Sequence, residues 1–151
     1  MVVAGDLTYT YEFGCTFLEL SFAKPVRISK HFVLKPPGLQ TSSGPDDVVV
    51  RIKPGAAFGA GNHPTTRLAI KGIEFVLYDR RISAGELNRN VLDIGTGSGV
   101  LLISAVLGGV KSGLCIDIDA CARAEAAANA SINGLENRFS ISGQSLADIR
   151  Q

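Results

Sequence analysis

A glycine-rich segment at residues 93–99 is the part of the chain best suited to bind a small ligand. It reads Asp-Ile-Gly-Thr-Gly-Ser-Gly and places Gly95, Thr96, Gly97 and Gly99 between two apolar runs. A glycine-rich turn lets the backbone approach a ligand that side chains would keep away. The amides at the start of a following helix then favour a negatively charged group. We expect a ligand-binding turn here; the alternative is a turn that binds nothing.

A carboxylate follows at a suitable distance along the chain. Asp117 lies 22 positions after Gly95, at the end of the apolar run Leu114–Asp117. In nucleotide-binding folds an acid at this place accepts hydrogen bonds from the hydroxyls of a ribose. An exposed aspartate or a helix cap is the alternative, but Asp119 suits the cap better. We therefore expect Asp117 to bind a ribose.

The glycine spacing indicates which nucleoside is bound. A dinucleotide fingerprint would have its third glycine at position 100, where this chain has Val100. Asp93, two positions before the first glycine, instead resembles the acid of motif I in class I S-adenosylmethionine-dependent methyltransferases. The resemblance implies S-adenosylmethionine as cofactor, with Asp93 holding its amine directly or through water; bracing the turn is the alternative role for Asp93. It also implies that Gln144 contacts the adenine amine, unless Gln144 belongs to an ordinary surface turn.

Strands and helices alternate around these residues. Short apolar runs at Val91–Ile94, Leu114–Asp117 and Phe139–Ser142 predict strands. The runs Val100–Leu107 and Ala120–Asn133 between them predict helices. This order predicts right-handed crossovers and a parallel sheet. The fold class is therefore α/β with the topology of nucleotide-binding folds, and the resemblance above implies a Rossmann-like sheet of the class I methyltransferase type.

The region before this sheet predicts strands followed by one helix. Pro64 suits the first turn of a helix, capped by Asn62 or His63. The expected buried face of this helix comprises Leu68, Gly72, Ile73, Val76 and Leu77. The expected strands, which we take as antiparallel, are Thr8–Phe13, Thr16–Ala23, Val26–Leu34 and Val48–Ile52. We divide the chain into a small β-rich segment, residues 1–50, and an S-adenosylmethionine-binding domain, residues 51–151.

The stretch from Ile52 to Leu68 carries a more specific resemblance. It reads Ile-Lys-Pro-Gly-Ala-Ala-Phe-Gly-Ala-Gly-Asn-His-Pro-Thr-Thr-Arg-Leu. It is similar to the segment before motif I in the bacterial lysine methyltransferases that act on ribosomal protein eleven of the large subunit. The similarity extends over about residues 25–145. It implies N-methylation of a protein, with a ribosomal protein as partner.

The same resemblance assigns roles to several residues of this stretch. In that family the loop covers the bound cofactor. The residues here suit this role, because Phe58 between small residues can cover an apolar face of the ligand and Gly59 and Gly61 let the loop fold over. Thr65 and Thr66 would present hydroxyls and first-turn amides to the cofactor carboxylate. Three roles are open for His63: a cofactor contact, a helix cap and a base.

The chain departs from that family in several places. Ala60 replaces the usual threonine, and Gly38 stands where an aromatic residue commonly follows the Pro-Pro pair. Only a short β-rich piece precedes the sheet, and the chain ends before the fourth strand. We therefore interpret it as a fragment or a truncated relative with a sheet incomplete at its C-terminal end. The catalytic base is unknown, and Val91–Ile94 is expected to present an unpaired apolar edge that favours self-association.

Composition excludes other classes of function. Fifteen Lys and Arg against fourteen Asp and Glu give a net charge of +1, which argues against a nucleic-acid groove built on bulk positive charge. Three cysteines without a nearby histidine pattern favour a reducing, cytoplasmic setting over disulfides or a metal site, and no apolar run is long enough for a membrane span. Two alternatives stay open: an S-adenosylmethionine-binding module without catalysis, and a nicotinamide-dependent oxidoreductase, which Val100 disfavours.

Overall fold

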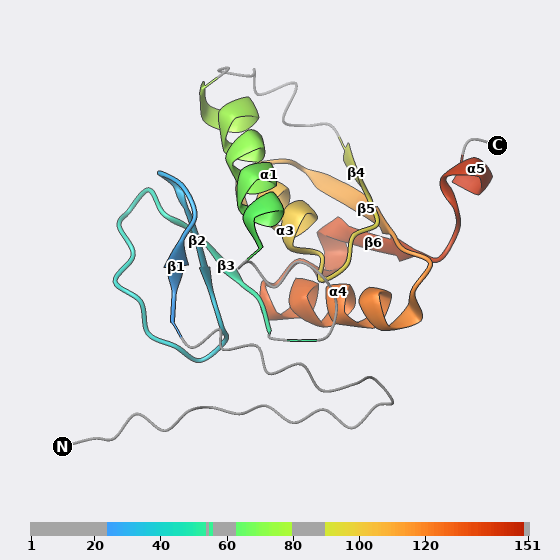
Figure 1. Ribbon diagram of the computed structural model, residues 1–151, viewed down its shortest axis with the longest axis horizontal. Coiled ribbons are helices and arrows are strands. Elements are labelled where there is room, and N and C mark those ends of the chain that lie inside the picture. Colours follow the sequence, from blue (N-terminus) through green and yellow to red (C-terminus); the bar gives the residue numbers. More distant parts are fainter. Residues whose placement is uncertain (1–23, 54, 56–62, 80–89, 150–151) are drawn as a thin grey trace.

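The computed structural model describes residues 24–53, 55, 63–79 and 90–149 (Figure 1). The strands predicted at Thr8–Phe13 and Thr16–Ala23 lie outside these residues, as do Phe58 and Gly59. Within the described part, no helix is long and apolar enough to cross a membrane.

A three-stranded parallel sheet lies at the centre of the fold. Its strands are β4 (Asn90–Ile94), β5 (Ser112–Ile116) and β6 (Phe139–Ser142), in the order β4-β5-β6. Helices α3 (Val100–Leu107) and α4 (Ala120–Ile132) form the crossovers. A short 3₁₀ turn, η2 (Glu136–Arg138), precedes β6, and helix α5 (Leu146–Ile149) follows it. The predicted parallel α/β sheet is therefore confirmed, with each strand within two residues of its expected bounds.

Helix α3 is apolar on all sides because it is surrounded by protein. It contacts β4 and β5 on one side and β3 and α1 on the other, and Leu102, Ile103 and Val106 are fully buried. Gly113 of β5 makes this close packing possible, since a Cβ there would lie 2.6 Å from the Val91 carbonyl oxygen and would overlap the Leu102 side chain. The helix that follows the glycine loop is thus fixed directly on the sheet.

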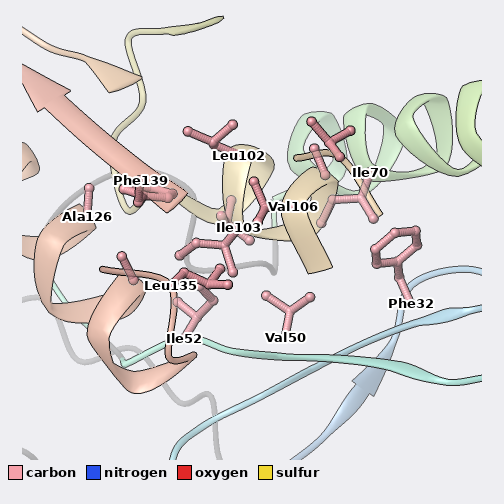
Figure 2. Packing of buried hydrophobic residues seen from close by; sticks show 14 of the residues in the cluster. Phe32, Val50, Ile52, Ile70, Leu102, Ile103, Val106, Ala126, Leu135 and Phe139 are labelled. Carbon is pink, nitrogen blue, oxygen red and sulfur yellow. The ribbon is translucent and has the colours of Figure 1, made fainter. Parts of the chain in front are cut away.

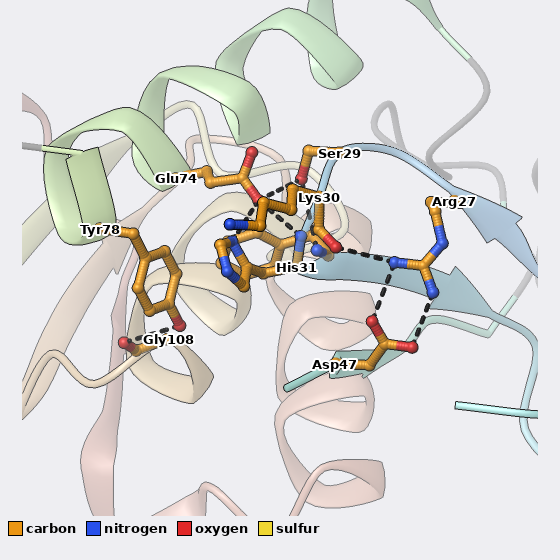
Figure 3. Close-up of polar contacts among 9 residues, drawn as sticks. Arg27, Ser29, Lys30, His31, Asp47, Glu74, Tyr78 and Gly108 are labelled. Carbon is orange, nitrogen blue, oxygen red and sulfur yellow. Dashed lines mark hydrogen bonds and ion pairs between the residues drawn. The ribbon is translucent and has the colours of Figure 1, made fainter. Parts of the chain in front are cut away.

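The N-terminal strands differ from the prediction in two ways. The single strand expected over Val26–Leu34 is a hairpin of β1 (Val26–Arg27) and β2 (Phe32–Lys35), because the Glu74 carboxylate accepts hydrogen bonds from the Ser29 hydroxyl and the His31 amide and holds a turn there (Figure 3). β1 and β2 are antiparallel as expected. β2 and β3 (Val48–Arg51) are parallel, since the connection over residues 36–47 is long enough to return the chain to the other end of the sheet.

Helix α1 (Pro64–Glu74) begins at the predicted proline and continues into a π-helical turn, η1 (Phe75–Asp79). The predicted buried face is wrong for most of its members. Leu68 is 71% exposed, whereas Thr66 and Ile70 are buried. The helix turns this side inward because Ile70 joins the cluster that contains Phe32 of β2 and Val106 of α3 (Figure 2).

One hydrophobic core joins the N-terminal strands to the central sheet. Phe32, Val50 and Ile52 belong to the same buried cluster as Ile103 of α3 and Phe139 of β6 (Figure 2). Burial of this kind is the main favourable term in folding. The N-terminal sheet is therefore packed on α3, and the division of the chain near residue 50 stays a prediction.

Arg138, in η2, connects the turn before β6 to the last turn of α3 and to the segment before β5. Its guanidinium donates hydrogen bonds to the carbonyl oxygens of Lys111 (2.7 Å), Val106 (3.2 Å) and Val110. These carbonyls lie in the last turn of α3 and in the segment that leads into β5. The Val106 carbonyl belongs to the last turn of α3, where carbonyls lack a partner four residues on in the helix, and the same guanidinium also satisfies two carbonyls of the segment that follows.

Candidate functional site

The glycine loop after β4 has the left-handed backbone that its glycines allow. The φ angles are +71° at Gly95, +53° at Gly97 and +80° at Gly99. A Cβ at Gly95 would meet no heavy atom within 4 Å, whereas one at Gly99 would lie 3.2 Å from the Cα of Ala126 in α4. Gly95 is exposed, and residues 96–99 are buried. The loop therefore faces open space at Gly95 and packs on α4 at Gly99.

Backbone amides tie the loop to the end of β5. The amides of Gly95 and Thr96 donate to the Ile116 carbonyl oxygen at 2.8 and 3.2 Å. The Gly97 amide donates to Oδ2 of Asp117 at 3.0 Å. The structure therefore brings together the glycine loop and the acid that the sequence pairs with it, at the carboxyl ends of two neighbouring parallel strands. Ligands of open α/β sheets bind at this edge.

Asp117 is held in place with part of its hydrogen-bonding capacity unused. Besides the Gly97 amide on Oδ2, its Oδ1 accepts from the Asp119 amide at 3.0 Å. An ionised carboxylate offers about four acceptor positions, so two such bonds leave room for two hydroxyl donors. Its backbone is fixed as well, because the Arg123 guanidinium donates to the Asp117 carbonyl oxygen at 2.8 Å. Asp119 caps α4 through the Cys121 amide, at 2.8 Å, as predicted.

Asp93 lies beneath the loop and contacts it. The Thr96 hydroxyl donates to Oδ2 of Asp93 at 2.8 Å and lies 2.9 Å from Sγ of Cys115. Burial raises the pKa of Asp93, and the nearby charge of Asp117 raises it further, against the opposing effect of the Thr96 hydrogen bond. Burial also raises the pKa of the Cys115 thiol to about 12. The contact with Thr96 braces the turn, and contact of Asp93 with a cofactor amine stays a prediction.

The ends of β5 and β6 complete this edge of the sheet. Ile118, directly after Asp117, is an isoleucine with 85% of its surface exposed. Gln144 is exposed two residues after β6, and its backbone N–H donates to the Ser142 hydroxyl at 3.1 Å. A Cβ at Gly143 would lie 3.0 Å from Cζ of Arg123. The exposed Ile118 and Gln144 thus follow neighbouring strands, and the Arg123 guanidinium donates to the Ile118 carbonyl oxygen at 3.0 Å.

The start of α1 contains three further predicted residues. Nδ1 of His63 accepts from the Thr65 amide at 3.3 Å and lies 2.6 Å from the Thr65 hydroxyl oxygen, which confirms His63 as the cap. Thr66 is buried, and Thr65 is exposed. Cofactor contacts of His63, Thr65 and Thr66 stay predictions, as do those of Phe58 and Gly59.

Sequence reasoning missed three residues that support or line this site. They are Ile118, Arg123 and Asn129. Asn129 is 1% exposed within the alanine-rich helix α4, and its Nδ2 donates to the Ser98 carbonyl oxygen of the glycine loop at 2.9 Å. A usable signal was present, because an asparagine four residues before Asn133 places two amides on one side of an otherwise alanine-rich helix.

Known proteins resemble this chain over most of its length. The model of the family described as ribosomal protein L11 methyltransferase (PrmA) matches residues 19–150. A ribosomal protein L11 methyltransferase of Citrifermentans bemidjiense is 40% identical over 126 residues, which cover 83% of this chain and 40% of that protein. One of Exiguobacterium sibiricum is 38% identical over 80% of this chain and 36% of that protein.

A solved structure shares the fold. The crystal structure of ribosomal protein L11 methylase from Lactobacillus delbrueckii subsp. bulgaricus superposes with a TM-score of 0.68 at 34% identity, over 82% of this chain and 59% of that chain. The chain thus spans about two fifths of the length of the curated relatives above.

Proposed function

Because the chain belongs to the ribosomal protein L11 methyltransferase family, we propose that it binds S-adenosylmethionine at the carboxyl ends of β4, β5 and β6 and serves in methylation of a ribosomal protein on lysine. The observation that carries the proposal is the geometry of Asp117. Its carboxylate is fixed by the amides of Gly97 and Asp119 and keeps acceptor positions for the two hydroxyls of a ribose.

The charges at this edge favour a cationic ligand. Asp93 and Asp117 lie close enough for the charge of Asp117 to raise the pKa of Asp93. A pyrophosphate would meet two carboxylates here, whereas an amine and a sulfonium would be attracted to them. The site therefore supports S-adenosylmethionine over a nicotinamide dinucleotide. Val100 also argues against a dinucleotide, since a buried valine stands where the dinucleotide fingerprint has its third glycine.

The residues at hand fit the parts of this cofactor. Asp117 would accept from the ribose, and the exposed apolar side chain of Ile118 would cover a face of the adenine, with the Gln144 side chain near its amine. The open side of Gly95 leaves space for the methionine part, whose amine Asp93 would hold. Phe58, Gly59, His63, Thr65 and Thr66 are proposed to complete the site from the loop before α1.

The protein's contribution to the reaction is mainly positional. The bound cofactor supplies an electrophilic methyl group on a positively charged sulfur, so the leaving group needs no acid. The chain's residues therefore have to bind and orient the cofactor, keep water away and leave one side open to the acceptor amine. The base that takes the proton from a lysine acceptor stays unassigned.

Calorimetry with S-adenosylhomocysteine and with NAD tests the cofactor. We expect the chain to bind S-adenosylhomocysteine with one site and to bind NAD more weakly. Tighter binding of NAD, or no binding of S-adenosylhomocysteine, would overturn the proposal. Transfer of a radiolabelled methyl group to purified ribosomal proteins tests the activity separately, because binding without transfer would leave a cofactor-binding module.

We also propose that the chain self-associates through β4. This strand lies at the end of the sheet order, and Leu92 and Ile94 on it are 42% and 56% exposed. An exposed apolar edge strand offers unpaired backbone groups to another chain. We further propose a reducing compartment such as the cytoplasm, since the Cys115 thiol is buried beside the Thr96 hydroxyl and burial raises its pKa, as for an inert core thiol.

A further inference from the structure

One buried carboxamide joins the glycine loop to the segment that follows β3. Asn129 lies on α4, and its Nδ2 donates to the Ser98 carbonyl oxygen at 2.9 Å. Its Oδ1 accepts from the Lys53 amide at 2.9 Å. With 1% of its surface exposed, Asn129 has both ends of its side chain committed inside the protein. Burial of a polar side chain costs free energy unless its hydrogen-bonding groups have partners, and Asn129 has a partner at each end of its carboxamide.

The hydrogen bond from Asn129 fixes one peptide of the glycine loop. The Ser98–Gly99 peptide is held at its carbonyl by Asn129 and at its N–H by the Thr96 carbonyl oxygen, at 2.9 Å. Gly99 lies against Ala126, one turn before Asn129 on α4. The C-terminal half of the loop is therefore set by α4, while its first half is set by β5 and Asp117.

Asn133 makes a similar set of bonds without reaching the loop. Its Oδ1 accepts from the Arg51 amide at 3.0 Å, and its Nδ2 donates to the carbonyl oxygens of Arg51 and Asn129, both at 2.7 Å. Both asparagines thus join α4 to the end of β3. Of the two, Asn129 is the one that bonds to the glycine loop, at the Ser98 carbonyl oxygen, which makes Asn133 a matched control.

We propose that Asn129 is a positioning residue for the cofactor: its carboxamide holds the glycine loop in register with the segment after β3. This rests on the proposed function. The cofactor meets the loop on its Gly95 side, and Asn129 acts from the opposite side, through the Ser98 carbonyl. Loss of the Nδ2 donor removes the bond through which α4 holds the Ser98–Gly99 peptide.

The test compares three variants of the chain by calorimetry with S-adenosylhomocysteine, at a temperature where each is folded by circular dichroism. We expect Asn129→Ala to weaken binding by about tenfold or more, and Asn133→Ala to bind within about twofold of the wild type although its melting temperature falls. Asn129→Asp keeps an acceptor for the Lys53 amide but has no donor for Ser98, so it should bind as weakly as Asn129→Ala. Asn129→Asp also replaces Asn129→Ala as the test variant if Asn129→Ala does not fold.

The outcomes separate this inference from the proposed function. Wild-type affinity in Asn129→Asp would overturn the positioning role while leaving the cofactor assignment intact. An equal loss in Asn133→Ala would also overturn it, because the effect would then follow stability alone. Failure of the wild type to bind would overturn the proposed function and the inference together. Amide exchange checks the mechanism: the Gly99 amide should exchange faster in Asn129→Asp than in Asn133→Ala, and equal rates would count against it.

Discussion

The carboxylate of Glu74 lies 2.9 Å from Nδ1 of His31, across the junction between helix α1 and the N-terminal sheet (Figure 3). The same carboxylate accepts from the His31 amide and the Ser29 hydroxyl. The His31 ring stacks on Tyr78 with 4.5 Å between ring centres, and the Tyr78 hydroxyl donates to the Gly108 carbonyl oxygen. This group of side chains therefore connects the first hairpin to α1, η1 and the end of α3.

The junction predicts a loss of stability in acid. Burial opposes ionisation of Glu74, but its hydrogen bonds with His31 and Ser29 outweigh that effect and hold its pKa below the ordinary 4.5. A lowered pKa contributes stability above pH 4.5, which is lost as the pH falls through the folded-state pKa. Glu74→Gln should therefore cost about 1.5–3 kcal/mol of unfolding free energy at pH 7, and less at pH 3.

Urea unfolding at the two pH values measures this difference. Asp46→Asn is the control, since Asp46 is an exposed carboxylate in the same part of the chain, and it should change stability by less than about 0.5 kcal/mol. A cost for Glu74→Gln that is the same at both pH values would show that the carboxylate charge does not contribute.

The position of Asp117 predicts a change in affinity for the cofactor. Asp117→Asn keeps the shape of the side chain but removes the charge that strengthens bonds from the ribose. We expect S-adenosylhomocysteine to bind about tenfold to a hundredfold more weakly, as for lost bonds to a charged group. Asp119→Asn, which changes the neighbouring helix cap, should bind like the wild type. Equal losses in both variants, by calorimetry, would argue against a ribose contact at Asp117.

Two glycine-to-alanine changes should shift stability in opposite directions. At Gly113, a Cβ would lie 2.6 Å from the Val91 carbonyl oxygen, so Gly113→Ala should destabilise the chain by about 1–3 kcal/mol. At Gly72, in helix α1, nothing lies within 4 Å of the added atom, so Gly72→Ala should stabilise by about 0.5–1 kcal/mol. Thermal unfolding distinguishes the two, and destabilisation by both would contradict the described packing.

The apolar strand β4 predicts association that a single charge reduces. Leu92→Lys places a lysine on this edge strand and should lower the sedimentation coefficient toward that of a 15.9 kDa monomer. Leu68→Lys changes an equally apolar residue, 71% exposed on α1, and should leave association unchanged. A wild-type chain that sediments as a monomer would refute the proposal directly.

The sequence was most informative where structure is local. The strands β4, β5 and β6 could be predicted because each reads as a short apolar run, which is the pattern typical of parallel strands. The glycine loop and Asp117 follow from one strand–turn–helix unit, and the cap at His63 needs only its neighbours. Each of these could be predicted because the partners lie within about one supersecondary unit.

Long-range contacts explain the errors. Whether α1 buries Leu68 or Ile70 depends on where Phe32 and α3 lie, which no period along the helix reveals. The turn at Ser29 depends on Glu74, 45 residues away, and Asn129 bonds to Ser98 and Lys53 at separations of 31 and 76 residues. In these cases tertiary partners override the local pattern.

The guanidinium of Arg138 should hold the chain together after proteolytic cleavage. It comes from the short turn before β6, yet it holds carbonyls at the end of α3 and before β5. If a protease cleaved the chain at the exposed Gly134, these hydrogen bonds and the common hydrophobic core would still connect the two pieces, so the pieces should stay associated. Replacement of Arg138 should weaken this association, since the pairing of β6 with β5 and the shared core would then hold the pieces without the guanidinium.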